Sequence, residues 1–180
     1  CTMALNPREA NDDRVNDAVL EILPRYLEKN SVVGVGEIGL DDMTPKEEKY
    51  FEAQIRLAID HDLPILVHTP HRNKKQGFVR CIEIIAASGL PWDRVLLDHG
   101  NEETIKITRD TGAWQGFSIY PNTKMSPERM AAIVKEYGIE RIIINSACDW
   151  GVSDPLSVPK TVDILEAAGR PAADIDRLVW

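Results

Sequence analysis

Apolar runs that end on a polar residue recur along this chain. One run reaches Glu37 between two glycines, a second ends at His68, and a third is followed by Asp98 and His99. Continuous apolar runs of this length, bounded by turn residues, are typical of strands that are buried on both faces of a parallel sheet. A carboxylate at the end of such a strand is costly to bury unless a cation or hydrogen-bond donors receive it. The pattern therefore predicts that three buried strands each present a metal-capable side chain.

The spacing of these residues favours one fold. Positions 37, 68 and 99 are 31 residues apart, and one βα unit of a (β/α)₈ barrel of about 250 residues occupies roughly 31 residues. The active site of that fold lies at the C-terminal ends of the strands. We therefore expect Glu37, His68 and His99 to meet at one end of a parallel sheet.

The remaining elements extend the same alternation. Thr44-Pro45 and Ser126-Pro127 pair an N-cap residue with proline at the first helical position, which marks two helix starts. Pro24 is expected to kink or divide the first helix. The expected strands are 1–5, 32–38, 63–68, 94–98, 113–119 and 141–145, and the expected helices are 15–27, 45–61, 78–87, one opening at 101–104, 127–137 and 161–168.

Six βα repeats predict a parallel sheet with right-handed crossovers. A closed barrel needs eight strands, so the chain forms either an open sheet or part of a longer protein. We predict one α/β domain over residues 1–180, a (β/α)₈ TIM barrel that is incomplete in this chain.

Composition and charge narrow the choice of partners. The net charge of −8 is unfavourable for gripping duplex phosphates through the whole surface, so nucleic acid is possible as a partner but not favoured. No apolar run approaches the roughly 20 residues that span a bilayer, and nothing resembles a signal peptide. Three widely spaced cysteines argue against a disulfide framework, and we expect a cytoplasmic protein without membrane contact.

The motifs resemble one known family. Gly36–Asp41, followed by Phe51–Gln54 and then Leu63–His68, resembles the TatD-like metal-dependent hydrolases of the amidohydrolase superfamily. This resemblance implies a (β/α)₈ barrel that binds one or two divalent ions, with phosphodiesterases acting on DNA among its members. Carried over by motif, Glu37 matches the carboxylate that bridges the metals, and His68 and His99 match later histidine ligands.

The chain departs from this family in three places. The opening His-x-His ligand pair has no counterpart, so we expect a fragment that lacks the first two βα units. The late Glu-Thr-Asp motif is altered to Asn145–Asp149. Asp149 is the expected metal ligand and proton acceptor, and Asp154 is the alternative.

The third departure concerns the histidine-x-arginine motif, which becomes His68-Thr69-Pro70-His71-Arg72. His71, Arg72 and Lys74 are therefore candidates for binding substrate, and the alternative is an ordinary charged loop. A further loop with Tyr120, Asn122 and Lys124 is expected at the same end of the sheet.

Histidine and carboxylate ligands suit a divalent cation without distinguishing zinc, manganese, iron, nickel or magnesium. Such an ion lowers the pKa of a bound water molecule to about 7. The expected function is therefore metal-dependent hydrolysis of a phosphodiester or related ester or amide bond, in a small-molecule or phosphoester substrate. Two alternatives stay open: a barrel without chemistry that serves as a binding or pathway-assembly protein, and a hydrolase of C–N or lactone bonds. The oligomeric state is not determined by the sequence.

Overall fold

The computed structural model describes residues 1–120, 124–147 and 152–179. Its centre is one six-stranded sheet in which every neighbouring pair is parallel and the strand order follows the sequence, β1 to β6. The strands are β1 (Thr2–Met3), β2 (Gly34–Gly39), β3 (Ile65–His68), β4 (Val95–Leu97), β5 (Trp114–Ile119) and β6 (Ile142–Ser146). The expected parallel α/β architecture with six strands is confirmed.

Helices connect each strand to the next. The α-helices are α1 (Asn16–Leu27), α2 (Pro45–Asp60), α3 (Lys74–Ser88), α4 (Ile105–Thr111), α5 (Pro127–Tyr137), α6 (Ser157–Ala167) and α7 (Ala172–Val179), and two short 3₁₀ helices are η1 (Pro7–Asn11) and η2 (Trp92–Arg94). No helix among the described residues is long and apolar enough to cross a membrane.

The predicted helix starts are correct at two positions for the expected reason. The side chain of Thr44 accepts a hydrogen bond from the backbone N–H of Glu47, and that of Ser126 accepts one from Arg129. Each therefore satisfies one of the free N–H groups of its helix, and the proline that follows has no N–H to satisfy.

Other boundaries differ from expectation. Helix α1 continues through Pro24 without dividing, because the apolar face on either side of the proline packs on the core through Leu23 and Leu27. Helix α3 starts four residues earlier than expected, at Lys74, in a polar stretch without apolar periodicity. Helix α7 is absent from the sequence expectation, although Pro171 precedes it and its buried residues Ile175 and Leu178 have helical spacing.

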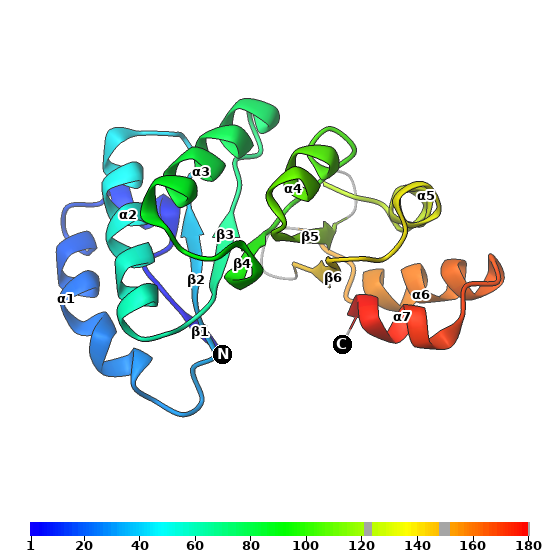
Figure 1. Ribbon diagram of the computed structural model, residues 1–180, viewed down its shortest axis with the longest axis horizontal. Coiled ribbons are helices and arrows are strands. Elements are labelled where there is room, and N and C mark those ends of the chain that lie inside the picture. The colour runs from blue at the N-terminus through cyan, green and yellow to red at the C-terminus, as the bar shows by residue number, and fades with distance from the viewer. Residues whose placement is uncertain (121–123, 148–151, 180) are drawn as a thin grey trace.

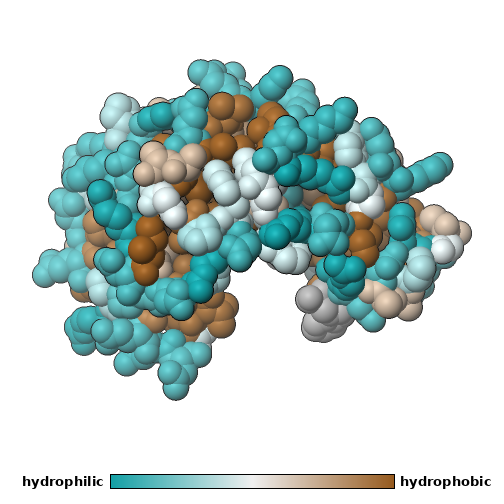
Figure 2. Space-filling view, viewed as in Figure 1, coloured by the Kyte–Doolittle hydropathy of each residue, from teal (hydrophilic) through white to brown (hydrophobic). Residues whose placement is uncertain are grey.

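The six strands form an arc rather than a closed ring. Figure 1 shows the helices along the outside of this arc, with β1 and α7 on the two sides of its opening, and Figure 2 shows a notch in the surface between them. Leu66, Leu96 and Trp114 lie in register on β3, β4 and β5 and are only half-buried. In a closed barrel, such layers of side chains are completed by the remaining strands. The expectation of an incomplete barrel is therefore confirmed.

Candidate metal centre

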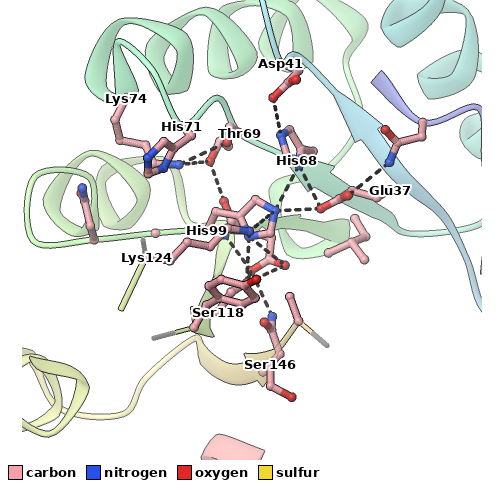
Figure 3. Close-up of a pocket in the computed structure, with 18 of the residues that line it drawn as sticks. Glu37, Asp41, His68, Thr69, His71, Lys74, His99, Ser118, Lys124 and Ser146 are labelled. Atoms are coloured by element: carbon pink, nitrogen blue, oxygen red, sulfur yellow. Dashed lines mark hydrogen bonds and ion pairs between the residues drawn. The ribbon is translucent and has the colours of Figure 1, made fainter. Parts of the chain in front are cut away.

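Three of the predicted ligands meet at the C-terminal ends of adjacent strands. Glu37 lies on β2 and His68 is the last residue of β3, while His99 follows β4 in the next loop. Oε1 of Glu37 lies 3.2 Å from Nδ1 of His68 and 3.0 Å from Nε2 of His99, and these two nitrogens are 3.1 Å apart. Figure 3 shows the three side chains converging on one point of the pocket.

This triangle fits a metal ion. Tetrahedral zinc bonds of about 2.0–2.1 Å place ligand atoms roughly 3.3 Å from one another. The three observed distances are close to that value, and one carboxylate oxygen with two imidazole nitrogens is a donor set that divalent transition metals accept. Among the described residues, these are also the three that group as potential metal ligands.

Close backbone packing brings β2 and β3 together at this point. Gly39 has a φ of 134°, and a Cβ atom there would lie 2.3 Å from the carbonyl oxygen of His68. A Cβ at Gly36 would lie 2.5 Å from Cβ of Leu66. The two glycines that flank Glu37 in the sequence are therefore required for the approach of the neighbouring strand.

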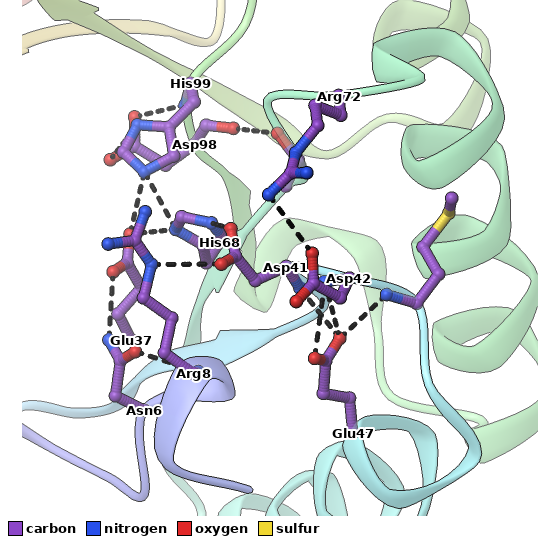
Figure 4. Close-up of polar contacts among 12 residues, drawn as sticks. Asn6, Arg8, Glu37, Asp41, Asp42, Glu47, His68, Arg72, Asp98 and His99 are labelled. Atoms are coloured by element: carbon purple, nitrogen blue, oxygen red, sulfur yellow. Dashed lines mark hydrogen bonds and ion pairs between the residues drawn. The ribbon is translucent and has the colours of Figure 1, made fainter. Parts of the chain in front are cut away.

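Each imidazole ring also has a hydrogen-bonding partner at the nitrogen that faces away from Glu37. The Nε2 atom of His68 lies 3.3 Å from Oδ1 of Asp41, and the other oxygen of Asp41 pairs with Nε of Arg8 at 3.0 Å. The Nδ1 atom of His99 lies 2.7 Å from Oγ of Ser118. Partners of this kind fix the tautomer and orientation of a ligating histidine. Figure 4 shows that Arg8 contacts Asp41, which in turn contacts His68, on one side of the cluster.

The backbone of His99 is in the left-handed region, with a φ of 60°. Asp98 stabilises this turn, because its Oδ1 accepts a hydrogen bond of 2.7 Å from the N–H of His99. The buried Asp98 carboxylate also accepts hydrogen bonds from Ser118 Oγ at 3.3 Å and from Asn145 Nδ2 at 3.0 Å. A non-glycine residue in this conformation costs free energy, and such residues cluster at functional sites.

The cluster changes the protonation of its own members. Burial acts to raise the pKa of Glu37, but hydrogen bonds with His68 and His99 outweigh it and hold the pKa well below its ordinary value. Burial lowers the pKa of His99, against the hydrogen bond with Glu37. An ionised carboxylate beside a neutral imidazole is the state in which both groups can ligate a metal.

The other predicted site residues are distributed differently. His71, Arg72 and Lys74 all line the same cavity, whose volume is about 1270 Å³. His71 and Arg72 are exposed, and Arg72 pairs with Asp42 at 3.5 Å. Asp149 and Asn122 lie outside the described residues.

The alternative late aspartate, Asp154, is engaged elsewhere. Its carboxylate pairs with Lys160 at 2.6 Å and accepts the N–H of Leu156 at the start of α6. In the altered motif at the end of β6, the side-chain amide of Asn145 donates a hydrogen bond to Asp98, the residue that stabilises the turn at His99.

Several site residues were missed by the sequence analysis. Asn6 reaches Glu37 Oε2 at 3.4 Å, and Arg8 pairs with Asp41 from the short helix η1. Ser118 comes from β5, three strands away from the strand of Glu37 in the sheet order. The position of Asp41 in the Gly36–Asp41 motif was a signal for its involvement, but Asn6, Arg8 and Ser118 carried none.

Comparison with known proteins gives one consistent family. Residues 1–162 match the model of the TatD-related DNase family. An uncharacterized metal-dependent hydrolase of Methanocaldococcus jannaschii is 30% identical over 145 residues, which are 81% of this chain and 57% of that protein. The crystal structure of a TatD-like protein from Archaeoglobus fulgidus is 30% identical with a TM-score of 0.69, and the match covers 88% of this chain and 62% of that one.

A third relative is a 3'-5' ssDNA/RNA exonuclease TatD of Pectobacterium carotovorum. It is 35% identical over 72 residues, which are 37% of this chain and 27% of that protein. The chain thus spans about three fifths of the length of the first two relatives.

Proposed function

This chain belongs to the family of TatD-related DNases, and we propose that it carries the catalytic centre of a divalent-metal-dependent hydrolase that cleaves phosphodiester or related ester or amide bonds. The observation that carries the proposal is the triangle of Glu37, His68 and His99, in which three ligand atoms lie 3.0–3.2 Å apart at the ends of adjacent strands. The relatives support it, since one is named a metal-dependent hydrolase and another an exonuclease of single-stranded DNA and RNA.

Each residue of the centre has a proposed task. Glu37, His68 and His99 hold the ion, and Asp41 and Ser118 keep the two rings in their ligating orientation. A divalent ion at this position supplies a Lewis acid that lowers the pKa of a water molecule to about 7. Asp149 orients that water molecule and accepts its proton, and His71, Arg72 and Lys74 contact the substrate.

We infer that one ion binds at this triad. The ligand chemistry fits zinc, manganese, iron or nickel. We also propose that residues 1–180 act as a single incomplete barrel domain in the cytoplasm. The location rests on the odd number of widely spaced cysteines.

The test is an assay of hydrolysis by the full-length protein that the gene encodes. Bis(p-nitrophenyl) phosphate and an end-labelled single-stranded oligonucleotide are compared with p-nitrophenyl acetate and a lactone, with Mn²⁺ or Zn²⁺ and with a chelator. We expect metal-dependent cleavage of the phosphodiesters, abolished by His68→Ala and retained in His61→Ala, since His61 is the C-cap of α2 and lies outside the cluster.

A second pair of variants tests the proton acceptor. Asp149→Asn should lower the turnover number at least 100-fold, a loss typical of general-base removal. Asp154→Asn should leave it unchanged, because Asp154 pairs with Lys160. Metal binding without turnover of any substrate would instead favour a barrel that serves as a binding protein without catalysis. Selective cleavage of the lactone would identify the protein as a lactone hydrolase.

A further inference from the structure

One tyrosine in the cavity of the metal centre has no task in the catalysis proposed above. Tyr120 directly follows β5 and lines the cavity that contains Glu37, His68 and His99. This tyrosine is only 7% exposed. A hydroxyl group in so buried a position needs either a hydrogen-bond partner within the protein or access to the cavity.

The alternation of side chains along β5 directs Tyr120 toward the metal centre. Phe117 and Ile119 belong to the apolar core that includes the buried residues of α5. Ser118 points to the opposite face, where its Oγ lies 2.7 Å from Nδ1 of His99 (Figure 3). Successive side chains of a strand point to opposite faces. Tyr120 therefore lies on the face of Ser118, two residues further toward the end of the sheet that carries the site.

The hydroxyl group of Tyr120 is open to this cavity. No atom of a described residue makes a hydrogen bond with it, and it is not among the polar atoms that the protein encloses without a partner. Other buried hydroxyl groups of the cavity are engaged: Ser118 contacts His99 and Asp98, and Thr69 donates to the carbonyl oxygen of Asp98. Tyr120 therefore offers a ligand a hydroxyl group that the described residues do not use.

Tyr50 shows the usual arrangement of a buried tyrosine. It is 3% exposed, and its hydroxyl donates to Oδ1 of Asp17 at 2.5 Å. Tyrosine hydroxyls generally find such a partner when they are buried. Since the described part of the chain supplies none for Tyr120, its partner is expected to come from a molecule bound in the cavity.

The backbone holds Tyr120 in this position. Its N–H donates to the carbonyl oxygen of Met125 at 3.0 Å, and the preceding residue, Ile119, forms a β-bridge with Met125. Met125 is itself buried in the core. A donor that is fixed before the substrate binds needs no reorganisation during the reaction.

We propose that Tyr120 is a catalytic residue whose hydroxyl donates a hydrogen bond to a non-bridging oxygen of the substrate's phosphoryl group. This inference rests on the proposed hydrolase function and adds a residue that acts on the reacting group. A phenol is a hydrogen-bond donor at neutral pH, and a phosphoryl oxygen is an acceptor. Catalysis of phosphoryl transfer depends mainly on positioning and on stabilising the charge of these oxygens, which is the contribution of a fixed donor.

Turnover by the full-length protein gives the first test. Tyr120→Phe removes one oxygen atom and should lower the turnover number for bis(p-nitrophenyl) phosphate about 100-fold, as expected for the loss of one donor to the transition state. KM should change little. The affinity for Zn²⁺, measured by titration calorimetry, should be unchanged, because Tyr120 is not a ligand of the ion.

Tyr50→Phe is the matched control. It removes the same atom from another buried tyrosine, whose hydroxyl contacts Asp17 outside the cavity, and should retain full turnover. A turnover number of Tyr120→Phe equal to that of the unmodified protein would refute the proposal.

Phosphate binding tests the same contact without turnover. Inorganic phosphate is titrated into Zn²⁺-loaded protein that is free of excess ion and carries 3-fluorotyrosine, with detection by ¹⁹F NMR. The signal that is absent from Tyr120→Phe should move as phosphate binds, whereas the signal of Tyr50 should not. Tyr120→Phe should weaken phosphate binding about tenfold. Phosphate affinity that is absent, or unchanged in Tyr120→Phe, would refute the contact.

These measurements also separate the proposal from the proposed function and from a role in folding. An inactive protein in which phosphate moves the Tyr120 signal would refute the proposed hydrolysis alone. The midpoint of urea denaturation should not decrease in Tyr120→Phe, because the hydroxyl has no partner among the described residues to lose. A clear decrease would show that this hydroxyl is bonded within the protein and would overturn the inference.

Discussion

Oδ1 of Asp41 lies 3.3 Å from Nε2 of His68, on the side of the imidazole ring away from Glu37. The ring is thereby fixed with Nδ1 toward the cluster, where it lies 3.2 Å from Glu37 Oε1. The aspartate is in turn held by Arg8, so a short helix near the start of the chain controls the geometry of a ligand on β3.

The first prediction follows from this contact. Asp41→Asn removes the negative charge that supports His68 and should weaken Zn²⁺ or Mn²⁺ binding about tenfold, within the range of 10- to 100-fold known for such partners. Titration calorimetry on the metal-free protein measures it. Asp42→Asn is the control, because Asp42 pairs with Arg72 outside the cluster; equal effects of the two variants would contradict the role of Asp41.

The second prediction concerns the ligand itself. His68→Ala removes one corner of the triangle and should weaken metal binding by more than about 100-fold, since a ligand contributes more than its supporting partner. His61→Ala should bind like the unmodified protein. Unchanged affinity in His68→Ala would show that the triangle is not the metal site.

The third prediction concerns folding. Glu47 is buried on α2, and its carboxylate accepts the backbone N–H groups of Asp41, Asp42 and Met43 at 2.9–3.2 Å. In Glu47→Gln, an NH₂ group replaces one acceptor oxygen and faces these donors. The free energy of unfolding should fall by about 2–3 kcal/mol.

Urea denaturation measures this loss of stability. Glu52→Gln on the same helix is exposed and should change it by less than about 0.5 kcal/mol. A similar small change in Glu47→Gln would show that the loop after β2 does not depend on this carboxylate.

The fourth prediction concerns the pH dependence of stability. Burial first and Lys124 second lower the pKa of Lys74 to about 8, while Asp98 and Cys81 act in the opposite direction. Below that pH both the folded and unfolded chains carry the proton, so the cost of burying the charge is fully present. Between about pH 8 and 10.4 the folded chain loses its proton first, and this cost disappears.

Lys74→Met should therefore stabilise the protein at pH 7, by about 1–3 kcal/mol, and the gain should vanish near pH 10.4. Urea denaturation at several pH values, with Lys75→Met as control, measures it. A gain that does not depend on pH would exclude charge burial as its cause.

The fifth prediction concerns cysteine reactivity. Burial raises the pKa of Cys81 to about 12, so its thiol remains neutral and inaccessible at pH 8. Iodoacetamide should modify the exposed Cys1 in the native protein and reach Cys81 only after denaturation, as peptide mass spectrometry would show. Rapid native modification of Cys81 would indicate local opening of α3.

The sequence by itself determined which strands carry the site. The hydrophobic pattern and the equal spacing were sufficient to predict that Glu37, His68 and His99 lie close together. Consecutive parallel strands with equal connections must place their C-terminal ends side by side. The helix starts at Thr44 and Ser126 were also predictable, since a cap acts on its own first turn.

Only the tertiary structure decided the surroundings of the cluster. Arg8 approaches it from η1 and Ser118 from β5, and their contacts depend on the packing of η1 and on sheet register, which no local pattern records. The choice of nitrogen in each ring was equally unpredictable: Asp41 turns Nδ1 of His68 toward Glu37, whereas Ser118 turns Nε2 of His99 toward it. A hydrogen bond to one nitrogen decides which nitrogen remains for the metal, and that partner comes from wherever the fold brings the chain.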